Sequence, residues 1–411
     1  MYKNASLLLT ASVVRYGGQL AVFGLFARWL GAAAAGRFAF ALAVTAPVFM
    51  LASLGMRDIY LTLRTDIALA HYEQVRAVTA IAAIVVSVAL SFLFPMNVAI
   101  LVAVVACSKA LDSFNDLYGA AMQKSSRIKF TVLTSAIVAI LQVATLATAL
   151  ALGAPMPTAL GLSTLSYLMS AIFVIRPITY KGLGDNEAVR ETGKSSRPWI
   201  EIVRVGFPTG ISLGLLTGVS TLPQYFLNWT RGPTDVGKYA IILYLVVAME
   251  MALNALAQSW IPVGRALEWE GMLSSRRILG VAVRWTLITL PFALVGIGIA
   301  AVAFPLVLGP AYTITMAEAI PLAVAMILTP AFFAATTSLA IQNRYQWGLI
   351  GSALTILAGI FIGWAIIKPF GVPGALWTLA VCLALRTAAA LMFTKHEPRV
   401  PRAGTAELEV L

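Results

Sequence analysis

Long hydrophobic stretches recur along the whole chain, and each is interrupted by charged residues or by proline and glycine. Each stretch is close to the roughly 20 residues that a helix needs to cross the hydrocarbon core of a bilayer. The pattern predicts an all-α integral membrane protein with about twelve transmembrane helices. These helices are expected near residues 5–27, 36–56, 77–95, 97–122, 131–152, 156–176, 204–228, 239–262, 279–303, 314–341, 347–367 and 372–394.

The composition agrees with a bilayer as the solvent. Of the 411 residues, 60% are hydrophobic and 11% are Asp, Glu, Lys or Arg, where soluble domains carry about 25% charged residues. These values exclude an ordinary soluble enzyme, and twelve spans leave no room for a sizeable soluble domain. Cys107 and Cys382 fall in separate apolar stretches and the chain has only two histidines. We therefore expect no disulfide and no metal site.

A formal charge of +12 is typical of proteins that bind nucleic acids, but the positions of the basic residues relative to the predicted helices suggest another explanation. Twenty of the 29 basic residues, Arg76 among them, lie in alternate connections or at the termini, five lie on the other side, and four lie within helices. Because positively charged loops stay on the cytoplasmic side, this bias predicts that both termini are cytoplasmic. It also removes most of the reason to expect a nucleic acid as partner.

The longest polar stretch divides the chain into two halves of six helices. The predicted regions are an N-terminal bundle (1–180), a cytoplasmic linker (181–203), a C-terminal bundle (204–394) and a cytoplasmic tail (395–411). Gly31 and Gly36, before Arg37, recur 201 residues later as Gly232 and Gly237, before Lys238. The matching position in each half favours an internal repeat, a common way to build alternating-access transporters. Chance similarity between two glycine-rich turns is the alternative.

Polar residues at membrane depth are the candidates for function, because a charge there costs at least about 2.5 to 3.5 kcal/mol unless it faces water or a partner. In the fourth span, Lys109, Asp112, Asp116 and Gln123 follow a helical spacing that places a cation, two carboxylates and an amide on one face. A self-satisfied Lys109–Asp112 pair that only holds helices together is the structural alternative. It leaves Asp116 unexplained.

In the first span, Arg15 and Gln19 lie four residues apart on one face of an apolar helix, which Arg28 ends. Arg15 either is neutralised by a carboxylate of the fourth span or faces a cavity. There it would attract an anionic group such as a diphosphate, for which guanidinium is a good bidentate donor. Arg57 and Asp58 follow the second span as an interfacial pair or a cytoplasmic gate.

The second half carries a weaker set of polar residues at membrane depth. Glu250, Asn254 and Gln258 recur every four residues in the eighth span, and Gln224 belongs to a polar stripe in the seventh. They line a cavity or, alternatively, serve helix packing. Arg284, Glu318 and Arg386 complete the charges, with Arg284 and Glu318 alternatively at the membrane interface.

Several short segments resemble the Wzx-type polysaccharide flippases of the multidrug/oligosaccharidyl-lipid/polysaccharide exporter superfamily. The resemblance is carried, in order, by Lys3-Asn4-Ala5-Ser6, Ala27-Arg28-Trp29-Leu30-Gly31, Ala52-Ser53-Leu54-Gly55-Met56-Arg57, Val203-Arg204-Val205-Gly206-Phe207-Pro208 and Leu308-Gly309-Pro310-Ala311-Tyr312. It implies two six-helix bundles around a central cavity and alternating access. It also implies a substrate made of an oligosaccharide on undecaprenyl diphosphate, as in O-antigen and lipopolysaccharide synthesis, in the bacterial inner membrane.

Together the residues and the resemblance predict the site. Expected partners are the lipid-linked oligosaccharide, membrane lipids, and a polysaccharide polymerase with chain-length proteins. The predicted gating residues are Arg57, Asp58 and Arg386, and the predicted substrate-binding residues are Arg15, Gln19, Arg28, Lys109, Asp112, Asp116, Gln224, Glu250, Asn254 and Arg284.

Two other functions remain open at this point. A drug/cation antiporter of the same superfamily would prefer a more acidic cavity. A membrane-bound glycosyltransferase or polymerase, the enzyme alternative, usually needs a large extramembrane loop, and no outer connection predicted here exceeds about a dozen residues. No G-x-x-x-x-G-K-[ST] motif for ATP is present. We expect no cofactor, and coupling to H⁺ or Na⁺ through Asp112, Asp116 and Glu250 is a hypothesis.

Overall fold

The computed structural model describes residues 2–62, 67–125, 127–183, 197–270, 272–342 and 344–393, and the described residues contain helices and no strand. The first half comprises α1 (Tyr2–Leu30), α2 (Ala32–Ala52), α3 (Met56–Thr62), α4 (Leu69–Ser91), α5 (Met96–Lys124), α6 (Ile128–Ala151), α7 (Met156–Ser170), the π-helix η1 (Ala171–Ile175) and α8 (Arg176–Leu183). The second half comprises α10 (Pro198–Thr230), α11 (Pro233–Trp269), α12 (Ser275–Leu308), the 3₁₀ turn η3 (Pro310–Tyr312), α13 (Met316–Ile341), α14 (Tyr345–Phe370) and α15 (Val372–Phe393).

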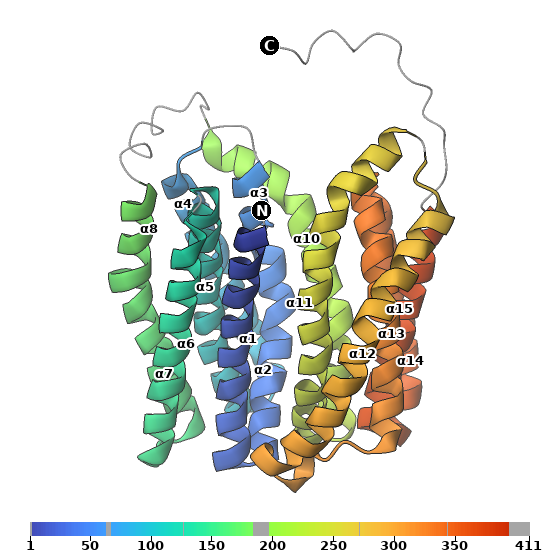
Figure 1. The fold of residues 1–411 in the computed structure, drawn as a ribbon. Coiled ribbons are helices and arrows are strands. Elements are labelled where there is room, and N and C mark those ends of the chain that lie inside the picture. Colours follow the sequence, from blue (N-terminus) through green and yellow to red (C-terminus); the bar gives the residue numbers. More distant parts are fainter. Residues whose placement is uncertain are drawn as a thin grey trace.

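The long helices run roughly parallel to one another in two bundles, one from each half of the chain (Figure 1). The upper end of the molecule, as drawn there, carries α3 and α8. At the lower end α1 turns into α2 and α10 turns into α11. The bundles meet mainly through α2, which packs against both α10 and α11. Tyr225 of α10 donates a hydrogen bond across this contact to the carbonyl oxygen of Ala43 at 2.9 Å.

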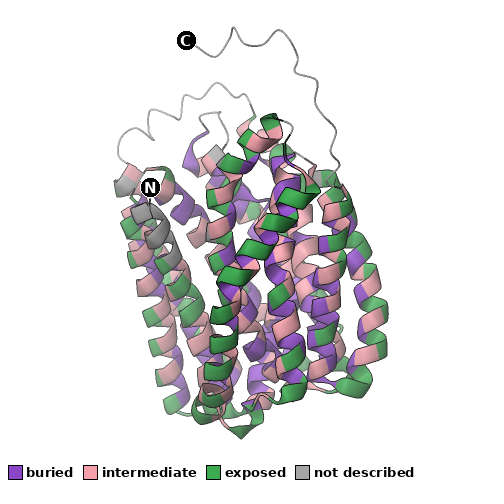
Figure 2. Ribbon diagram, turned by 45° about the vertical axis from the view of Figure 1, so that its right-hand side comes forward, coloured by how far each residue is buried: buried purple, intermediate pink, exposed green. Residues whose placement is uncertain are grey.

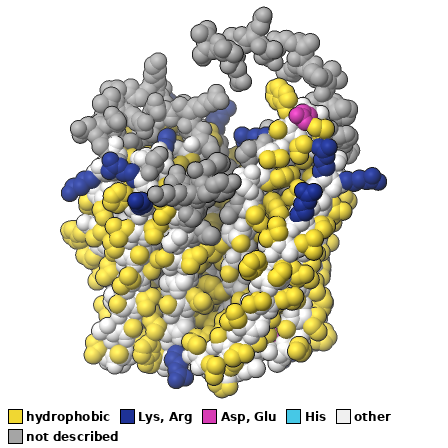
Figure 3. Space-filling view, viewed as in Figure 1, with side chains coloured by type: hydrophobic (Ala, Val, Ile, Leu, Met, Phe, Trp, Pro, Cys, Tyr) yellow, Lys and Arg dark blue, Asp and Glu magenta, His cyan; other side chains and the backbone are white. Residues whose placement is uncertain are grey.

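Eleven of the described helical segments are long and apolar enough to cross a membrane by length and composition, and α1 lies alongside them. Buried residues turn toward neighbouring helices (Figure 2), whereas large apolar side chains such as Val78, Phe92 and Phe292 are more than 60% exposed. In Figure 3 hydrophobic side chains cover the flank of the molecule, and the visible Lys and Arg side chains gather mostly near the upper end. The chain is a multi-pass membrane protein, as predicted.

Several helices extend beyond the predicted spans. The 37 residues of α11 make a helix of about 55 Å, longer than the roughly 30 Å hydrocarbon core. The prediction that Arg76 lies in a connection was wrong, because α4 begins at Leu69 rather than near residue 77. Hydropathy detects only the apolar part of a helix, and its backbone hydrogen bonds continue through polar residues. Residues 184–196 of the predicted linker and the predicted tail 395–411 lie outside the described residues.

The two copies of the predicted repeat meet at the lower end. Gly31 and Gly232 are the N-caps of α2 and α11, with φ of 83° and 90° and ψ of 170° and −179°. This left-handed region strains residues that carry a Cβ. Five residues on, Gly36 and Gly237 pack against each other, and a Cβ on Gly36 would overlap the carbonyl oxygen of Pro233. The repeat therefore forms a matched contact between the bundles.

A second glycine contact joins the bundles at the upper end. Gly206, Gly210 and Gly214 lie at four-residue intervals on α10, against the carbonyl oxygens of Leu54, Leu51 and Pro47. A Cβ at Gly206 or Gly210 would overlap those oxygens. Small residues four apart are the usual means of close approach between membrane helices. The sequence contains this spacing, which Gly218 continues.

Candidate functional site

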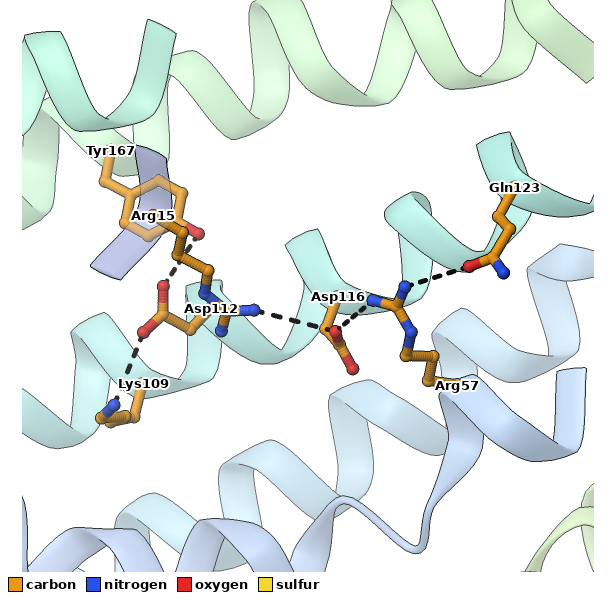
Figure 4. Close-up of polar contacts among 7 residues, drawn as sticks. All are labelled: Arg15, Arg57, Lys109, Asp112, Asp116, Gln123 and Tyr167. Carbon is orange, nitrogen blue, oxygen red and sulfur yellow. Dashed lines mark hydrogen bonds and ion pairs between the residues drawn. The ribbon is translucent and has the colours of Figure 1, made fainter. Parts of the chain in front are cut away.

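One face of α5 carries the charged groups of the candidate site. Lys109, Asp112, Asp116 and Gln123 project from this helix toward partners on three other helices (Figure 4). The partners are Arg15 of α1, Arg57 of α3 and Tyr167 of α7. The predicted polar stripe is therefore real, and it faces the interior of the first bundle. We call these seven residues the charged cluster.

Asp116 binds two arginines through one oxygen. Nη1 of Arg57 donates a hydrogen bond to Oδ1 of Asp116 at 2.9 Å, and Nη1 of Arg15 forms an ion pair with the same oxygen at 3.7 Å. Nη2 of Arg57 donates to Oε1 of Gln123 at 3.0 Å. Arg57 is thus held by two residues of α5. The excess carboxylate noted in the sequence is the group that joins α1 and α3 to α5.

Asp112 has partners of its own. Nζ of Lys109 lies 3.8 Å from Oδ2 of Asp112, and the hydroxyl of Tyr167 donates a hydrogen bond to Oδ1 at 3.1 Å. Tyr167 is buried, so its hydroxyl fixes Asp112 from inside the bundle. The Lys109–Asp112 pair that we considered as a structural alternative does form. It is one of two linked ion-pair groups rather than an isolated pair.

A cavity of about 70 Å³ lies beside the charged cluster, within the first bundle. Its walls come from α1, α2, α5, α6 and α7 and include Arg15, Gln19, Lys109, Asp112 and Tyr167. It is large enough for several water molecules but far smaller than the roughly 300–1,000 Å³ pockets that enclose drug-sized ligands. This cavity lies inside the first bundle, and the central cavity between the bundles that the resemblance implies stays a prediction.

Several side chains of the charged cluster are only partly covered by the protein. The side chain of Arg15 is 42% exposed although Arg15 lies near the middle of α1, and the side chains of Lys109, Asp112 and Asp116 are 23%, 27% and 30% exposed. A guanidinium this exposed at membrane depth is stable only beside water or a counter-ion, because hydrocarbon would destabilise it by several kcal/mol. Arg15 has a counter-ion in Asp116, and it lines a cavity that is large enough for water.

A break between α2 and α3 positions Arg57. Leu54 and Gly55 have φ of 51° and 59°, so the chain turns sharply and α3 starts in a new direction. The buried Arg76 of α4 donates from Nη1 to the carbonyl oxygen of Ser53 at 3.3 Å, at the end of α2. A cation at a helix C-terminus satisfies free carbonyls and stabilises the helix dipole. Gly55 also packs against Thr209 of α10, which links this break to the second bundle.

The predicted site residues divide into two groups. The structure brings together Arg15, Gln19, Arg57, Lys109, Asp112 and Asp116. Arg28 lies exposed near the lower end of α1, and Asp58 is exposed beside Arg57. Sequence reasoning missed Tyr167 and Asn115, which line the cavity with Gln142 and Ser163 of α6 and α7. Asn115 lies on α5 beside the charged stripe, and Tyr167 lies on α7 without a charged neighbour on that helix, so only the packing of the helices brings both to the cavity.

The predicted residues of the second half do not line this cavity. Gln224 is buried on α10, Asn254 and Arg284 are exposed, and Glu250 is half-buried on α11. Nη2 of Arg386 donates to Oγ of Ser352 at 3.1 Å, and its guanidinium lies 4.5 Å from the ring centroid of Phe332. The position of these residues inside or outside the substrate path remains a prediction.

A second buried ion pair lies at the lower end. Glu318 near the start of α13 is only 3% exposed, accepts hydrogen bonds from the N–H and hydroxyl of Thr315 at 2.9 and 3.2 Å, and pairs with Lys238 of α11. The side chain turns back onto its own helix start and meets α11, so Glu318 is buried within the protein, and its position at the membrane interface stays a prediction. Among the described residues, no group of three or more His, Cys, Asp or Glu gathers to hold a metal ion.

A family model that matches most of the chain identifies its family. The family described as "Polysaccharide biosynthesis protein" matches residues 1–265, which is more than half of the chain. The chain belongs to the polysaccharide biosynthesis protein family. Comparison with curated protein sequences yields no match.

Several solved transporter structures share the fold of this family member. The lipid II flippase MurJ in an inward closed conformation superposes with a TM-score of 0.66 at 11% identity, covering 94% of this chain and 86% of MurJ. An inward-facing multidrug resistance MATE transporter of the MOP superfamily gives 0.60 at 14% identity, with 95% and 93% covered. A MOP superfamily transporter from Pyrococcus furiosus, described as having a binding pocket of reverse polarity, gives 0.56 at 14% identity, with 94% and 93% covered. The fold is that of a MOP-superfamily transporter, as the sequence resemblance implied.

Proposed function

We propose that this protein is a flippase that moves an oligosaccharide linked to undecaprenyl diphosphate across the bacterial inner membrane by alternating access. Membership of a polysaccharide biosynthesis family and the likeness to a lipid II flippase support a lipid-linked sugar as substrate. The observation that carries the proposal is Arg15, an exposed guanidinium in the middle of an apolar helix, beside a water-sized cavity. Guanidinium groups bind phosphate oxygens in a bidentate way.

The headgroup is the part of such a substrate that the membrane opposes most. Sugars and phosphates lose their hydrogen bonds to water in hydrocarbon, at a cost of several kcal/mol for each unpaired group. Arg15, Lys109 and the amides of Gln19 and Asn115 replace those bonds for the phosphate, while the lipid tail stays in the bilayer. The cavity of about 70 Å³ admits only a small polar group. The sugars need the space that opens when the two bundles move apart.

The orientation follows from the basic residues. The visible Lys and Arg side chains gather mostly near the upper end (Figure 3), which is the end that the charge bias assigns to the cytoplasm. In this orientation both termini are cytoplasmic. The contact between α3 and α5, where Arg57 and Asp116 meet, then lies toward the leaflet in which lipid-linked oligosaccharides are assembled.

A drug/cation antiporter is the competing function, and the likeness to multidrug transporters is the observation behind it. The charged cluster contains three cations, Arg15, Arg57 and Lys109, against the carboxylates of Asp112 and Asp116. Its formal charge of +1 favours an anionic ligand. An antiporter for cationic drugs would need the opposite excess in its binding cavity.

Leaflet distribution of the substrate tests the proposal. Cells that lack the protein should accumulate lipid-linked oligosaccharide on the cytoplasmic leaflet, and wild-type protein should restore export. Arg15→Gln should restore at most a small fraction of it. Arg265→Gln, which changes an exposed arginine of α11 outside the cavity, is the matched control and should restore export fully. An unchanged leaflet distribution in the deletion, with altered resistance to cationic drugs, would favour the antiporter instead.

A further inference from the structure

Asp116 competes for Arg15 with any anion that enters the cavity. It holds Arg57 at 2.9 Å and Arg15 at 3.7 Å through the same oxygen, so one carboxylate neutralises part of two cations. An anionic ligand that binds Arg15 must therefore draw it away from Asp116. The free energy of that ion pair is subtracted from the binding of the ligand.

The two arginines are held to different degrees. Arg57 has a second hydrogen bond, to Gln123, and its contact with Asp116 is a short hydrogen bond. The Arg15–Asp116 pair is longer, and Arg15 is the more exposed of the two side chains, 42% against 34%. Long exposed ion pairs contribute little stability. Arg15 is therefore the cation that leaves Asp116 first.

The cavity gives the Arg15 side chain space to move away from Asp116. Arg15, Lys109 and Asp112 line the cavity, whereas Asp116 and Arg57 do not. Arg15 thus lies at the border between the cavity and Asp116 (Figure 4). Lys109 is in a similar situation, with its Nζ 3.8 Å from Asp112. An anion in the cavity meets two cations, and each is already paired loosely with a carboxylate.

We propose that Asp116 is an internal counter-ion that an anionic headgroup displaces from Arg15, so that the empty site is neutralised and binds only ligands with enough negative charge to compete. A diphosphate fits this requirement better than a singly charged group, because it can compensate Arg15 and Lys109 together. After displacement Asp116 stays with Arg57. This inference rests on the proposed function only for the identity of the natural ligand.

The proposal predicts a gain of affinity from the loss of a charge. Asp116→Asn keeps the shape of the side chain and removes the competitor. The full-length protein in lipid nanodiscs is titrated with inorganic pyrophosphate, and binding is measured by calorimetry. Asp116→Asn should bind pyrophosphate about fivefold more tightly than the wild type, the effect of losing an exposed ion pair of up to about 1 kcal/mol.

A double variant and a matched control make the test specific. Arg15→Gln combined with Asp116→Asn should lose the gain, because Arg15 is the group that Asp116 releases. Asp235→Asn, a carboxylate in the first turn of α11 in the other bundle, should bind pyrophosphate like the wild type. Unchanged or weaker binding by Asp116→Asn, or a gain that survives the loss of Arg15, would overturn the proposal.

The test of Asp116 does not depend on the folding of a single variant or on the proposed function. If Asp116→Asn does not yield a folded protein, Asp116→Ser removes the same charge and takes its place in the titration with the same expectation. The measurement uses no lipid-linked sugar. A normal leaflet distribution in the deletion strain would therefore remove the proposed function, while the exchange at Asp116 would still stand or fall on pyrophosphate binding alone.

Discussion

Gly36 of α2 and Gly237 of α11 face each other at the lower end of the molecule, so close that a Cβ on Gly36 would overlap the carbonyl oxygen of Pro233 and a Cβ on Gly237 would lie 2.9 Å from the carbonyl oxygen of Ala32. They occupy the same position in the two copies of the repeat. Each follows by five residues a glycine N-cap with nearly the same backbone angles. The two halves of the chain therefore close on each other through equivalent residues.

Adding a methyl group at this contact should force the bundles apart. Gly36→Ala places a Cβ where the carbonyl oxygen of Pro233 lies, so the helices must separate. We expect a loss of about 1 to 3 kcal/mol, the usual cost of overpacking, seen as a lower apparent unfolding temperature in detergent. Gly161→Ala in α7 is the control, because nothing lies near its Cβ position and alanine favours a helix. Equal stability of the two variants would contradict the contact.

Glu318 stabilises the protein in two ways, as the counter-ion of Lys238 and as the acceptor for the Thr315 N–H, and the loss of either should lower stability. Glu318→Gln keeps an acceptor for the Thr315 N–H but leaves Lys238 without its counter-ion, and Glu318→Ala removes both. Because breaking a buried ion pair costs about 3 to 5 kcal/mol, both variants should unfold at lower temperature, Glu318→Ala the more so. Glu270→Gln on the exposed end of α11 should unfold like the wild type. A stable Glu318→Ala variant would show that the pair contributes little.

The break that positions Arg57 offers a test with two matched glycines. Gly55 has φ of 59° and packs against Thr209, whereas Gly153 has φ of 78° with nothing near its Cβ position. Alanine imposes similar backbone strain at both sites, about 1 kcal/mol or more, but only Gly55→Ala also displaces α3 and Arg57. We expect Gly55→Ala to reduce transport at least severalfold at equal protein levels and Gly153→Ala to keep it. Equal transport by the two variants would show that the break at Gly55 does not position Arg57 for transport.

Two tyrosine hydroxyls should respond in opposite ways to removal. The Tyr167 hydroxyl donates to Asp112 at 3.1 Å, while the buried Tyr239 hydroxyl has no hydrogen-bond partner among the described residues. Tyr167→Phe should lose about 1.5 to 3 kcal/mol, because the bond is to a charged group. Tyr239→Phe should be neutral or stabilising, since it removes an unsatisfied polar group. Thermal unfolding in detergent measures both, and equal losses would argue against the Tyr167–Asp112 bond.

Local periodicity explains how much of the site could be predicted from the sequence. Lys109, Asp112 and Asp116 lie on one helix at spacings that fix their common face, so the polar stripe was visible without a structure. The twelve helices followed from hydropathy in the same way. The glycine repeat was visible too, and its two copies proved to touch.

Contacts between distant segments were beyond the sequence. Arg57 and Asp116 are 59 residues apart, and their hydrogen bond depends on a turn at Leu54 and Gly55 that no apolar pattern reveals. The location of the cavity inside the first bundle depends on the packing of five helices, which local sequence patterns do not reveal. The ends of α4 and α11 were misplaced because polar residues continue a helix beyond the bilayer.

The glycine row on α10 has a mechanical consequence. Gly206, Gly210 and Gly214 place no side chain between α10 and the backbone of α2 at three successive turns, so the two helices are held in register there by other residues, such as Tyr225. Interlocked side chains resist sliding because each displacement breaks many contacts at once. At these three positions a shift of α10 along α2 would break no side-chain contacts of α10, while the two backbones stay in contact.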